Sequence, residues 1–456
     1  MTGESEAEVQ SLQVDVLVAG GGSAGCAAAI ASAESGAYTI LVERAGNVGG
    51  TLVWQLLEHS AGFHDVSGNR VTGGIGQRFI DRLAAYGGSP GHVRDDVGYT
   101  ATRTPVNHVE LALVEAVMLA ESGVRLSLNS SVQGVEVEGG RIVAVSVVTP
   151  AGTLRVVPGA VVDATGDGVI ASLAGARMQS DAAENRQPTS LLVKVGGIDF
   201  GPFQEYVAGH PDQFRSGSQL TPASGEHQNL WGFGDLLREG YEAGVLSWPR
   251  NEVHVAAWPS RREVVLNLSR VAWRADDPDG SGNFPALARQ ALETVNWVRR
   301  YLPGSSGAYL AAVADRVGVR ESRRVLGRET VDREDVLTGR AWPDAIGLGA
   351  FPIDIHDASS ATMAHTEPPA RPYQIPLGCL ESVDCNNLFL AGRLISSTHE
   401  ANGSLRITAT CFVTGEAAGV AAAMSADSGQ VEIDKLQRVL RERGVLLEPL
   451  PPPQFP

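Results

Sequence analysis

A glycine-rich turn near the start of the chain has the residue types and spacing that bind the diphosphate of a dinucleotide. Gly20, Gly22 and Gly25 follow an apolar, β-branched run at 14–18 and precede an Ala-rich segment at 26–35 that is predicted to be helical. In this pattern the first glycine permits a sharp turn, the second lets the backbone approach the diphosphate, and the third lets helix and strand pack closely. The free N–H groups at the start of the helix would bind the phosphates.

An acidic residue follows at the distance that the motif requires. Glu43 lies 18 residues after Gly25, at the end of a second predicted strand at 39–42. A carboxylate there would accept hydrogen bonds from ribose hydroxyls and would disfavour a 2′-phosphate. The alternative is a glycine turn without a ligand. The motif does not by itself distinguish FAD from NAD.

Further segments resemble FAD proteins of the glutathione-reductase-like superfamily. Glu43-Arg44 followed by Gly49-Gly50-Thr51 is similar to the exit of the second strand in that superfamily, where glycines let the chain pass close to the flavin. The segment 163–168, which contains Ala164-Thr165-Gly166, resembles the stretch that closes the nucleotide site from behind. The resemblance implies FAD as the cofactor.

The segment 390–406 resembles the bacterial flavoproteins known as FAD-dependent oxidoreductases, and the segments 62–65, 319–324 and 351–357 resemble the same family. Matching pieces therefore extend over roughly residues 14–425. The cofactor-binding residues predicted from the motif and the resemblance are Gly20, Gly22, Ser23, Ala24, Gly25, Glu43, Arg44, Gly49, Gly50, Thr51, Val132, Ala164, Thr165, Gly166, Gly392, Arg393, Gly403, Ser404 and Arg406.

A long helix is predicted to begin near Gly403–Arg406 and to extend to about residue 426. Reduced flavin carries negative charge near N1 and the C2 carbonyl. The N–H groups and the dipole at the start of a helix would stabilise that charge. The sequence therefore predicts that this helix start faces the flavin and favours its reduction.

Five side chains are candidates for catalysis. Arg320 could bind a substrate carboxylate through two parallel hydrogen bonds, although its arginine-rich surroundings could equally be a solvated helix face. His399 or His356 could take the proton that leaves with the hydride, and His64 is a further candidate. A lone histidine is more often structural, and His64 or His399 could instead carry a covalent flavin bond. Tyr373 could donate a proton or a hydrogen bond.

The elements that must position these residues indicate an α/β fold with a Rossmann-type FAD-binding domain and an inserted α+β substrate domain. The FAD-binding domain is predicted to be discontinuous, over 1–180 and 376–446, with the substrate domain at 181–375. A Pro-rich tail occupies 447–456. Near the C-terminus the nucleotide-binding character returns in a predicted strand at 387–391.

Composition limits the partners. The net charge is −16 and the pI about 5.1, so nucleic acid and anionic membranes are not expected partners. The four cysteines have no metal-binding spacing, so no metal is expected. The first residues are acidic and polar, unlike a signal peptide, and we expect a cytoplasmic protein.

Three function classes remain. The first is a dehydrogenase or oxidase that moves a hydride from a small polar, anionic substrate to flavin N5 and passes electrons to oxygen or a separate acceptor. The second is a flavin reductase or monooxygenase supplied by NAD(P)H, although no second glycine fingerprint is visible. The third is a non-catalytic FAD-binding subunit. A homo-oligomer stays open for all three.

Overall fold

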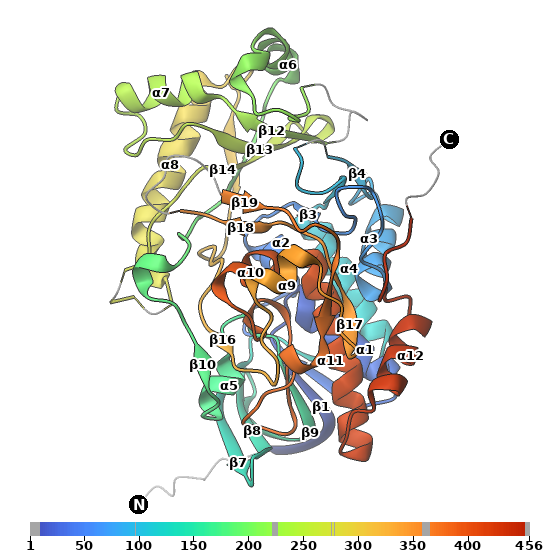
Figure 1. The fold of residues 1–456 in the computed structure, drawn as a ribbon. Helices are drawn as coiled ribbons and strands as arrows, with labels where there is room; N and C mark the ends of the chain where they lie inside the picture. The colour runs from blue at the N-terminus through green and yellow to red at the C-terminus, as the bar shows by residue number, and fades with distance from the viewer. Residues whose placement is uncertain are drawn as a thin grey trace, which may run out of the picture.

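The computed structural model describes residues 10–95, 97–220, 227–274, 276–277, 279–357 and 365–451. Its main sheet contains the parallel strands that the sequence predicts (Figure 1). Along the path of the sheet the strands are β6 (Arg125–Ser127), β2 (Thr39–Val42), β1 (Gln10–Ala19), β9 (Gly152–Asp163), β8 (Arg141–Thr149) and β7 (Ser131–Glu138), and β21 (Leu388–Leu390) also pairs with β9.

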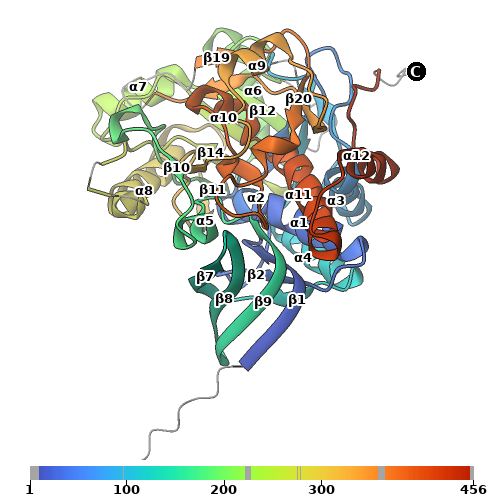
Figure 2. The same ribbon diagram turned by 60° about the horizontal axis from the view of Figure 1, so that its bottom comes forward.

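Strand β9 changes partner halfway along its length. Its first residues pair antiparallel with β8, whereas Val161 to Asp163 pair in parallel with β21. Its other edge pairs in parallel with β1, where Val16 lies opposite Ala160. Figure 2 shows β1, β9, β8 and β7 side by side. This arrangement brings the segment after residue 390 next to the glycine turn after β1, although some 370 residues separate them in the sequence.

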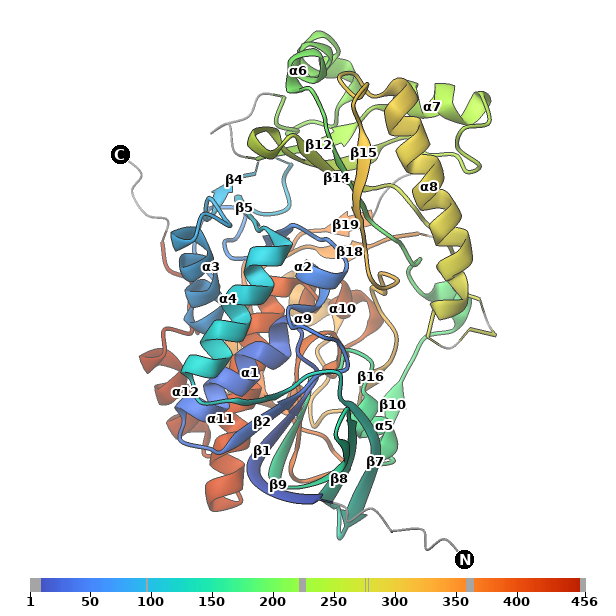
Figure 3. The same ribbon diagram turned by 180° about the vertical axis from the view of Figure 1, so that it is seen from behind.

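Two small-residue helices pack against each other beside the main sheet. They are α1 (Ser23–Glu34) and α11 (Thr408–Ser428) (Figure 3). A Cβ atom on Gly415 would lie 2.1 Å from the carbonyl oxygen of Ala24, and one on Gly419 would lie 2.2 Å from that of Ala28. The two backbones therefore touch, which explains why both helices are rich in Ala and Gly.

Helix α11 is long and apolar enough to cross a membrane, but 89% of its most apolar window is buried inside the protein. It is a core helix. The other helices of the first domain are α2 (Gly50–Trp54), α3 (Gly74–Ala85), α4 (His108–Glu121), α5 (Val169–Leu173), α9 (Arg333–Thr338), α10 (His399–Leu405) and α12 (Ile433–Glu442).

A second antiparallel sheet carries its own hydrophobic core, which confirms the predicted α/β class with an α+β insertion (top of Figure 1). Apart from Leu56, the buried members of this core lie between Leu191 and Ala314. The strands are, in order, β12 (Gln228–Gly232), β13 (Val253–Trp258), β14 (Glu263–Asn267), β11 (Val193–Gly196) and β15 (Tyr309–Val313), and the helices are α6 (Phe200–Gly209), α7 (Gly234–Glu242) and α8 (Phe284–Tyr301).

The segment that follows the second hydrophobic core packs into the core of the first domain well before the predicted boundary at residue 375. Val325, Ile346 and Tyr373 are all buried in the first core. The buried core of the second domain therefore ends before residue 375. Short paired strands connect the regions: β3 (His59–Ala61), β4 (Val93–Arg94), β5 (Thr102–Pro105), β10 (Met178–Gln179), β16 (Arg324–Val325), β17 (Ala345–Gly349), β18 (Ile353–Ile355), β19 (His365–Glu367) and β20 (Tyr373–Pro376).

The start of the predicted Pro-rich tail is attached to the first domain. Leu447 is buried in the first core, and Leu450 exchanges two backbone hydrogen bonds with Arg70, at 2.9 and 3.0 Å. Residues 452–456 lie outside the described part of the chain.

We predict that Gly419→Val lowers the free energy of unfolding by about 1–3 kcal/mol or more, because its side chain would enter the backbone of α1. Urea unfolding measures the change. Gly209→Ala is the control: it lies at the end of α6, its Cβ would meet no atom within 4 Å, and stability should stay equal or rise by up to about 1 kcal/mol. If Gly419→Val unfolds like the wild type, α1 and α11 do not touch as described.

Candidate functional site

A cleft of about 1050 Å³ lies between the two domains, and most of the predicted cofactor-binding residues line it. The lining contains the glycine turn after β1, the end of β2, the start of β7 and the turns after β9 and β21. The predicted residues in this lining are Gly20, Gly22, Ser23, Ala24, Glu43, Arg44, Gly50, Thr51, Val132, Ala164, Thr165, Gly166, Gly392, Arg393 and Arg406.

The three glycines of the motif have different physical roles. Gly20 has a φ of +97°, and a Cβ on Gly25 would lie 1.7 Å from the Gly20 carbonyl oxygen, so both are required by the protein's own packing. A Cβ on Gly22 would meet nothing closer than Gly50 Cα at 3.6 Å. No described protein atom therefore fills the space in front of Gly22, where a ligand would approach.

Helix α1 begins directly behind this open space. Its N-cap residue, Gly22, provides no side-chain hydrogen bond to the helix. The N–H groups at the helix start are thus available to a phosphate, and the helix dipole adds a partial positive charge. The glycine turn therefore fits the diphosphate of FAD.

Glu43 holds the glycine turn in shape. Its side chain is buried, and its two carboxylate oxygens accept hydrogen bonds from the N–H groups of Gly21 and Ala45, each at 2.7 Å. The carboxylate also lines the cleft. Its contact with ribose hydroxyls stays a prediction, while its structural role in the turn is visible.

The helix start that was predicted at Gly403–Arg406 lies slightly later in the chain. Short helix α10 ends at Leu405, and α11 begins at Thr408 with Ile407 as an N-cap that offers no side-chain bond. Ile407 and Thr408 line the cleft. The start of α11 therefore borders the cleft, whereas Gly403 and Ser404 do not line it.

Besides Gly25, three more predicted cofactor residues serve packing, and the described lining of the cleft does not include any of the four. A Cβ on Gly403 would lie 3.1 Å from the backbone nitrogen of Asp354, and the Ser404 hydroxyl donates to the carbonyl of Phe351 at 2.6 Å. Gly49, with a φ of +118°, accommodates the Val53 side chain. These glycines permit contact with the protein itself, which the sequence pattern could not distinguish from contact with a ligand.

A charged group lies in the same cleft. Asp354 Oδ2 is 3.2 Å from His356 Nε2 and 3.3 Å from Arg406 Nη2. Burial alone would raise the pKa of Asp354, but His356, Arg406 and Arg320 together lower it to about 2. Burial and the nearby Arg320 lower the pKa of His356 to about 4, although Asp354 opposes the shift. Asp354 is therefore ionised and His356 neutral at neutral pH.

Arg320 reaches this group from the segment that follows the second core. One guanidinium nitrogen donates to the Pro188 carbonyl at 2.7 Å and lies 3.4 Å from the Ser190 hydroxyl. Within the described part of the chain, no carboxylate lies within 4 Å of it as an ion pair. Burial lowers the pKa of Arg320 to about 9, and Arg406 and Arg270 contribute to the shift. Arg320 is still cationic at neutral pH, and a nearby anion would stabilise it.

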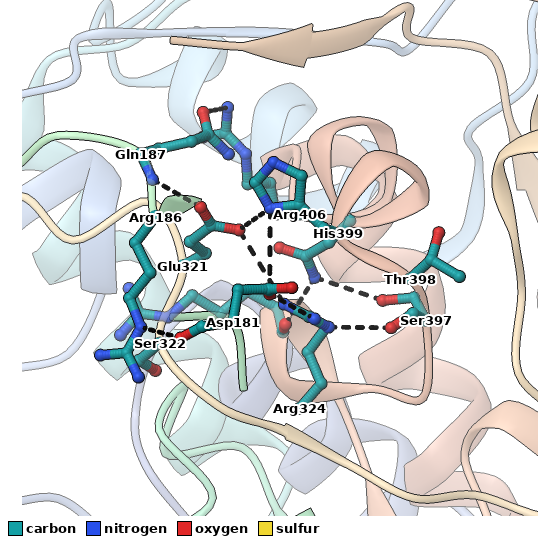
Figure 4. A network of polar contacts seen from close by, with 12 residues as sticks. Asp181, Arg186, Gln187, Glu321, Ser322, Arg324, Ser397, Thr398, His399 and Arg406 are labelled. Atoms are coloured by element: carbon teal, nitrogen blue, oxygen red, sulfur yellow. Dashed lines mark hydrogen bonds and ion pairs between the residues drawn. The ribbon is translucent and has the colours of Figure 1, made fainter. Parts of the chain in front are cut away.

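His399 belongs to a separate polar network (Figure 4). Its Nδ1 lies 2.8 Å from Glu321 Oε2 and 3.9 Å from Asp181 Oδ2, and Arg324 donates to Asp181 at 2.6 Å. The hydrogen bond to Glu321 raises the pKa of His399, although burial opposes it. His399 is not among the described residues that line the cleft, so its geometry favours a structural role.

His64 and Tyr373 also lie outside the described lining of the cleft. His64 Nδ1 is 2.8 Å from the Thr102 hydroxyl, and burial lowers its pKa. The Tyr373 hydroxyl is 2.6 Å from the Ser404 hydroxyl, and burial raises its pKa well above the usual range. Of the predicted catalytic residues, the cleft brings together only Arg320 and His356.

The cleft also contains residues that sequence reasoning missed. His59, Tyr99, Trp231, His254 and Arg316 all line it. Trp231 and His254 face each other because β12 pairs with β13, with 4.5 Å between their ring centroids. No motif marks these residues. They meet only through strand pairing and domain contact, and a local sequence pattern carries no signal of either.

We predict that His399→Gln destabilises the protein below pH 6.5 and that the difference from the wild type declines at higher pH. The pKa of His399 is raised in the folded state, so its stabilising contribution is complete below the unfolded value and is lost as the pH rises through the folded one. Urea unfolding from pH 6 to 9 measures it, with His210→Gln as an exposed-histidine control. A difference that grows with pH would contradict the pair with Glu321.

A family model described as FAD dependent oxidoreductase matches residues 15–440. Among solved structures, a geranylgeranyl bacteriochlorophyll reductase-like protein from Thermoplasma acidophilum is similar over 95% of this chain and 84% of its own, at 13% identity and a TM-score of 0.48. The OxyS anhydrotetracycline hydroxylase from Streptomyces rimosus is similar over 95% of this chain and 66% of its own, at 13% identity and a TM-score of 0.45. The p-nitrophenol 4-monooxygenase PnpA from Pseudomonas putida is similar over 95% of this chain and 82% of its own, at 10% identity and a TM-score of 0.44. No curated protein sequence matches the chain significantly.

The family model covers nearly the whole chain. Because of this match, and because the glycine turn and the cleft fit the cofactor, the chain belongs to the FAD dependent oxidoreductase family.

Proposed function

We propose that this flavoprotein is a dehydrogenase or oxidase that oxidises a small polar substrate carrying an anionic group. The observation that carries the proposal is Arg320, a cation that lines the cleft and has no carboxylate within ion-pair distance among the described residues. FAD, when bound, supplies the acceptor for a hydride at N5. Electrons would then pass to oxygen or to a separate acceptor.

The surroundings of Arg320 support an anionic substrate. Arg406 is a second guanidinium in the lining, and Asp354 is the carboxylate that pairs with it. Asp354 is also hydrogen bonded to His356. Asp354 is therefore shared by Arg406 and His356. A substrate carboxylate would supply a second negative charge beside Arg320, and the planar guanidinium of Arg320 can bind it through two hydrogen bonds.

The proton that leaves the substrate needs an acceptor with a free nitrogen. His356 has one ring nitrogen facing Asp354, and the other lies 3.4 Å from Arg270 Nη2. In contrast, His59 makes no hydrogen bond among the described residues, and burial lowers its pKa to about 4, so it is neutral at neutral pH. His59 therefore suits the role of proton acceptor better than His356 or His399.

The substrate class can be tested by anaerobic bleaching of the flavin. We expect hydroxy acids or amino acids to bleach it and the corresponding neutral alcohols and amines not to. Arg320→Lys keeps the charge but loses the planar pair of donors, and we expect it to raise KM for the acid by about 10-fold or more. Arg323→Lys is the matched control, because Arg323 is only half-buried and donates to the Ser172 hydroxyl outside the cleft.

Other results would reject this function. Equal bleaching by acids and by neutral analogues would exclude the anionic requirement. Steady consumption of NAD(P)H by the pure protein would select a reductase or monooxygenase. Bound FAD that no donor bleaches would favour a non-catalytic subunit.

We predict that His59→Ala lowers kcat by about 10²- to 10⁴-fold and that added imidazole restores part of the activity, because the small base can enter the vacated space. The wild-type kcat/KM should stay constant from neutral pH down to about pH 5, since the pKa of His59 lies near 4. Stopped-flow reduction of the flavin measures both. A fully active His59→Ala protein would remove His59 from the mechanism.

A further inference from the structure

The segment 315–317 connects the second domain to the dinucleotide end of the cleft. It begins two residues after Val313, where β15, the last strand of the second sheet, ends. The Asp315 N–H donates to the Trp54 carbonyl at 2.8 Å, and the Gln55 side chain donates to the Val317 carbonyl at 3.3 Å. One hydrogen bond on each side of Arg316 therefore holds its backbone against the end of helix α2 of the first domain.

The side chain of Arg316 lies over residues of the first domain. Its guanidinium carbon is 4.1 Å from the centroid of the Trp54 ring, and its Nη2 is 3.4 Å from Glu43 Oε1. Arg316, Trp54 and Glu43 all line the cleft beside the glycine turn. The side chain keeps 27% of its surface exposed, so it can still contact a ligand.

The charges at this end of the cleft are not balanced by Glu43 alone. Glu43 already accepts two backbone hydrogen bonds, from Gly21 and Ala45. Arg44 also lines the cleft and forms no ion pair with any described residue. Burial lowers the pKa of Arg316, and the proximity of Arg44 lowers it further, so the two cations repel each other. A phosphate group between them would relieve that repulsion.

We propose that Arg316 binds the adenosine diphosphate half of FAD, so that the second domain supplies a cofactor-binding residue and bound cofactor holds the two domains together. The site is assembled from Arg316 over Trp54 and Glu43, in front of the glycine turn. The inference depends on FAD as the cofactor and is independent of which substrate is oxidised.

The experiment measures the binding of FAD, ADP and FMN to the full-length chain freed of flavin, by fluorescence and calorimetry. We expect Arg316→Ala to weaken the binding of both FAD and ADP by about 10- to 100-fold, the effect of losing one charge-assisted hydrogen bond. Arg316→Lys should lose less, because it keeps the charge. Binding of FMN, which lacks the adenosine half, should not change.

Arg261→Ala is the matched control. Arg261 also belongs to the second domain, lies 4.9 Å from the centroid of an aromatic ring, Trp258, and pairs with a carboxylate of the first domain, Glu110, at 3.3 Å. It does not line the described cleft. Its removal should leave the binding of FAD and ADP unchanged.

Two outcomes would overturn the proposal. Unchanged or tighter binding of ADP by Arg316→Ala would show that Arg316 does not contact the cofactor. An equal loss in Arg261→Ala would show that any weakened domain contact lowers affinity. If Arg316→Ala does not fold, Arg316→Lys replaces it, because lysine retains the charge and most of the bulk. Lysine lacks the planar guanidinium donors, so Arg316→Lys should still weaken ADP binding measurably, whereas Arg261→Ala should not.

Discussion

The contact between Gly25 and the carbonyl of Gly20 sets the geometry on which the rest of the site depends. Only a residue without a Cβ fits there, and the close approach brings the start of α1 directly to the ends of β1 and β2. Glu43 then ties the turn to the second strand through Gly21. Because α11 packs backbone to backbone on α1, the glycine contact also fixes where α11 begins. Both helix starts consequently border one cleft.

The second domain completes this cleft with side chains of a different character. The glycine turns offer backbone N–H groups, which suit phosphates. The second domain and the segments beside it add guanidinium and imidazole groups to the lining, including Arg316, Arg320, His59 and His254. Cationic side chains therefore lie both beside the glycine turn and in the Asp354 group. Such a distribution suits an anionic cofactor together with an anionic substrate. Burial keeps His59 and His356 neutral, and Arg103 near His59 and Arg320 near His356 lower the pKa of each histidine further.

Sequence reasoning was most successful where one local segment carries the whole physical requirement. The turn at Gly20–Gly25, the strand before it and the acid at Glu43 are contiguous, and the structure places them as expected. Sequence reasoning was least successful where the same pattern fits both a ligand-binding residue and a residue that packs against or pairs with the protein itself. Gly403 and Gly49 accommodate protein atoms, and His399 pairs with Glu321, a residue 78 positions away in the sequence. The long helix begins at Thr408, later than predicted, because the helical conformation is interrupted between α10 and α11. No proline and no side-chain cap marks that interruption in the sequence.

The sequence by itself determined the parallel sheet and the segments that meet at the glycine turn, because both follow from local spacing and hydrophobic period. Its resemblance to FAD-dependent oxidoreductases indicated the family and the cofactor, and the family model agrees. The tertiary structure decided which side chains share the cleft. Arg316, His59 and Trp231 enter it from separate segments, and His64 and His399 are turned into other networks. That outcome depends on strand pairing and on how the second domain packs against the first, which are long-range interactions that no short stretch of residues encodes.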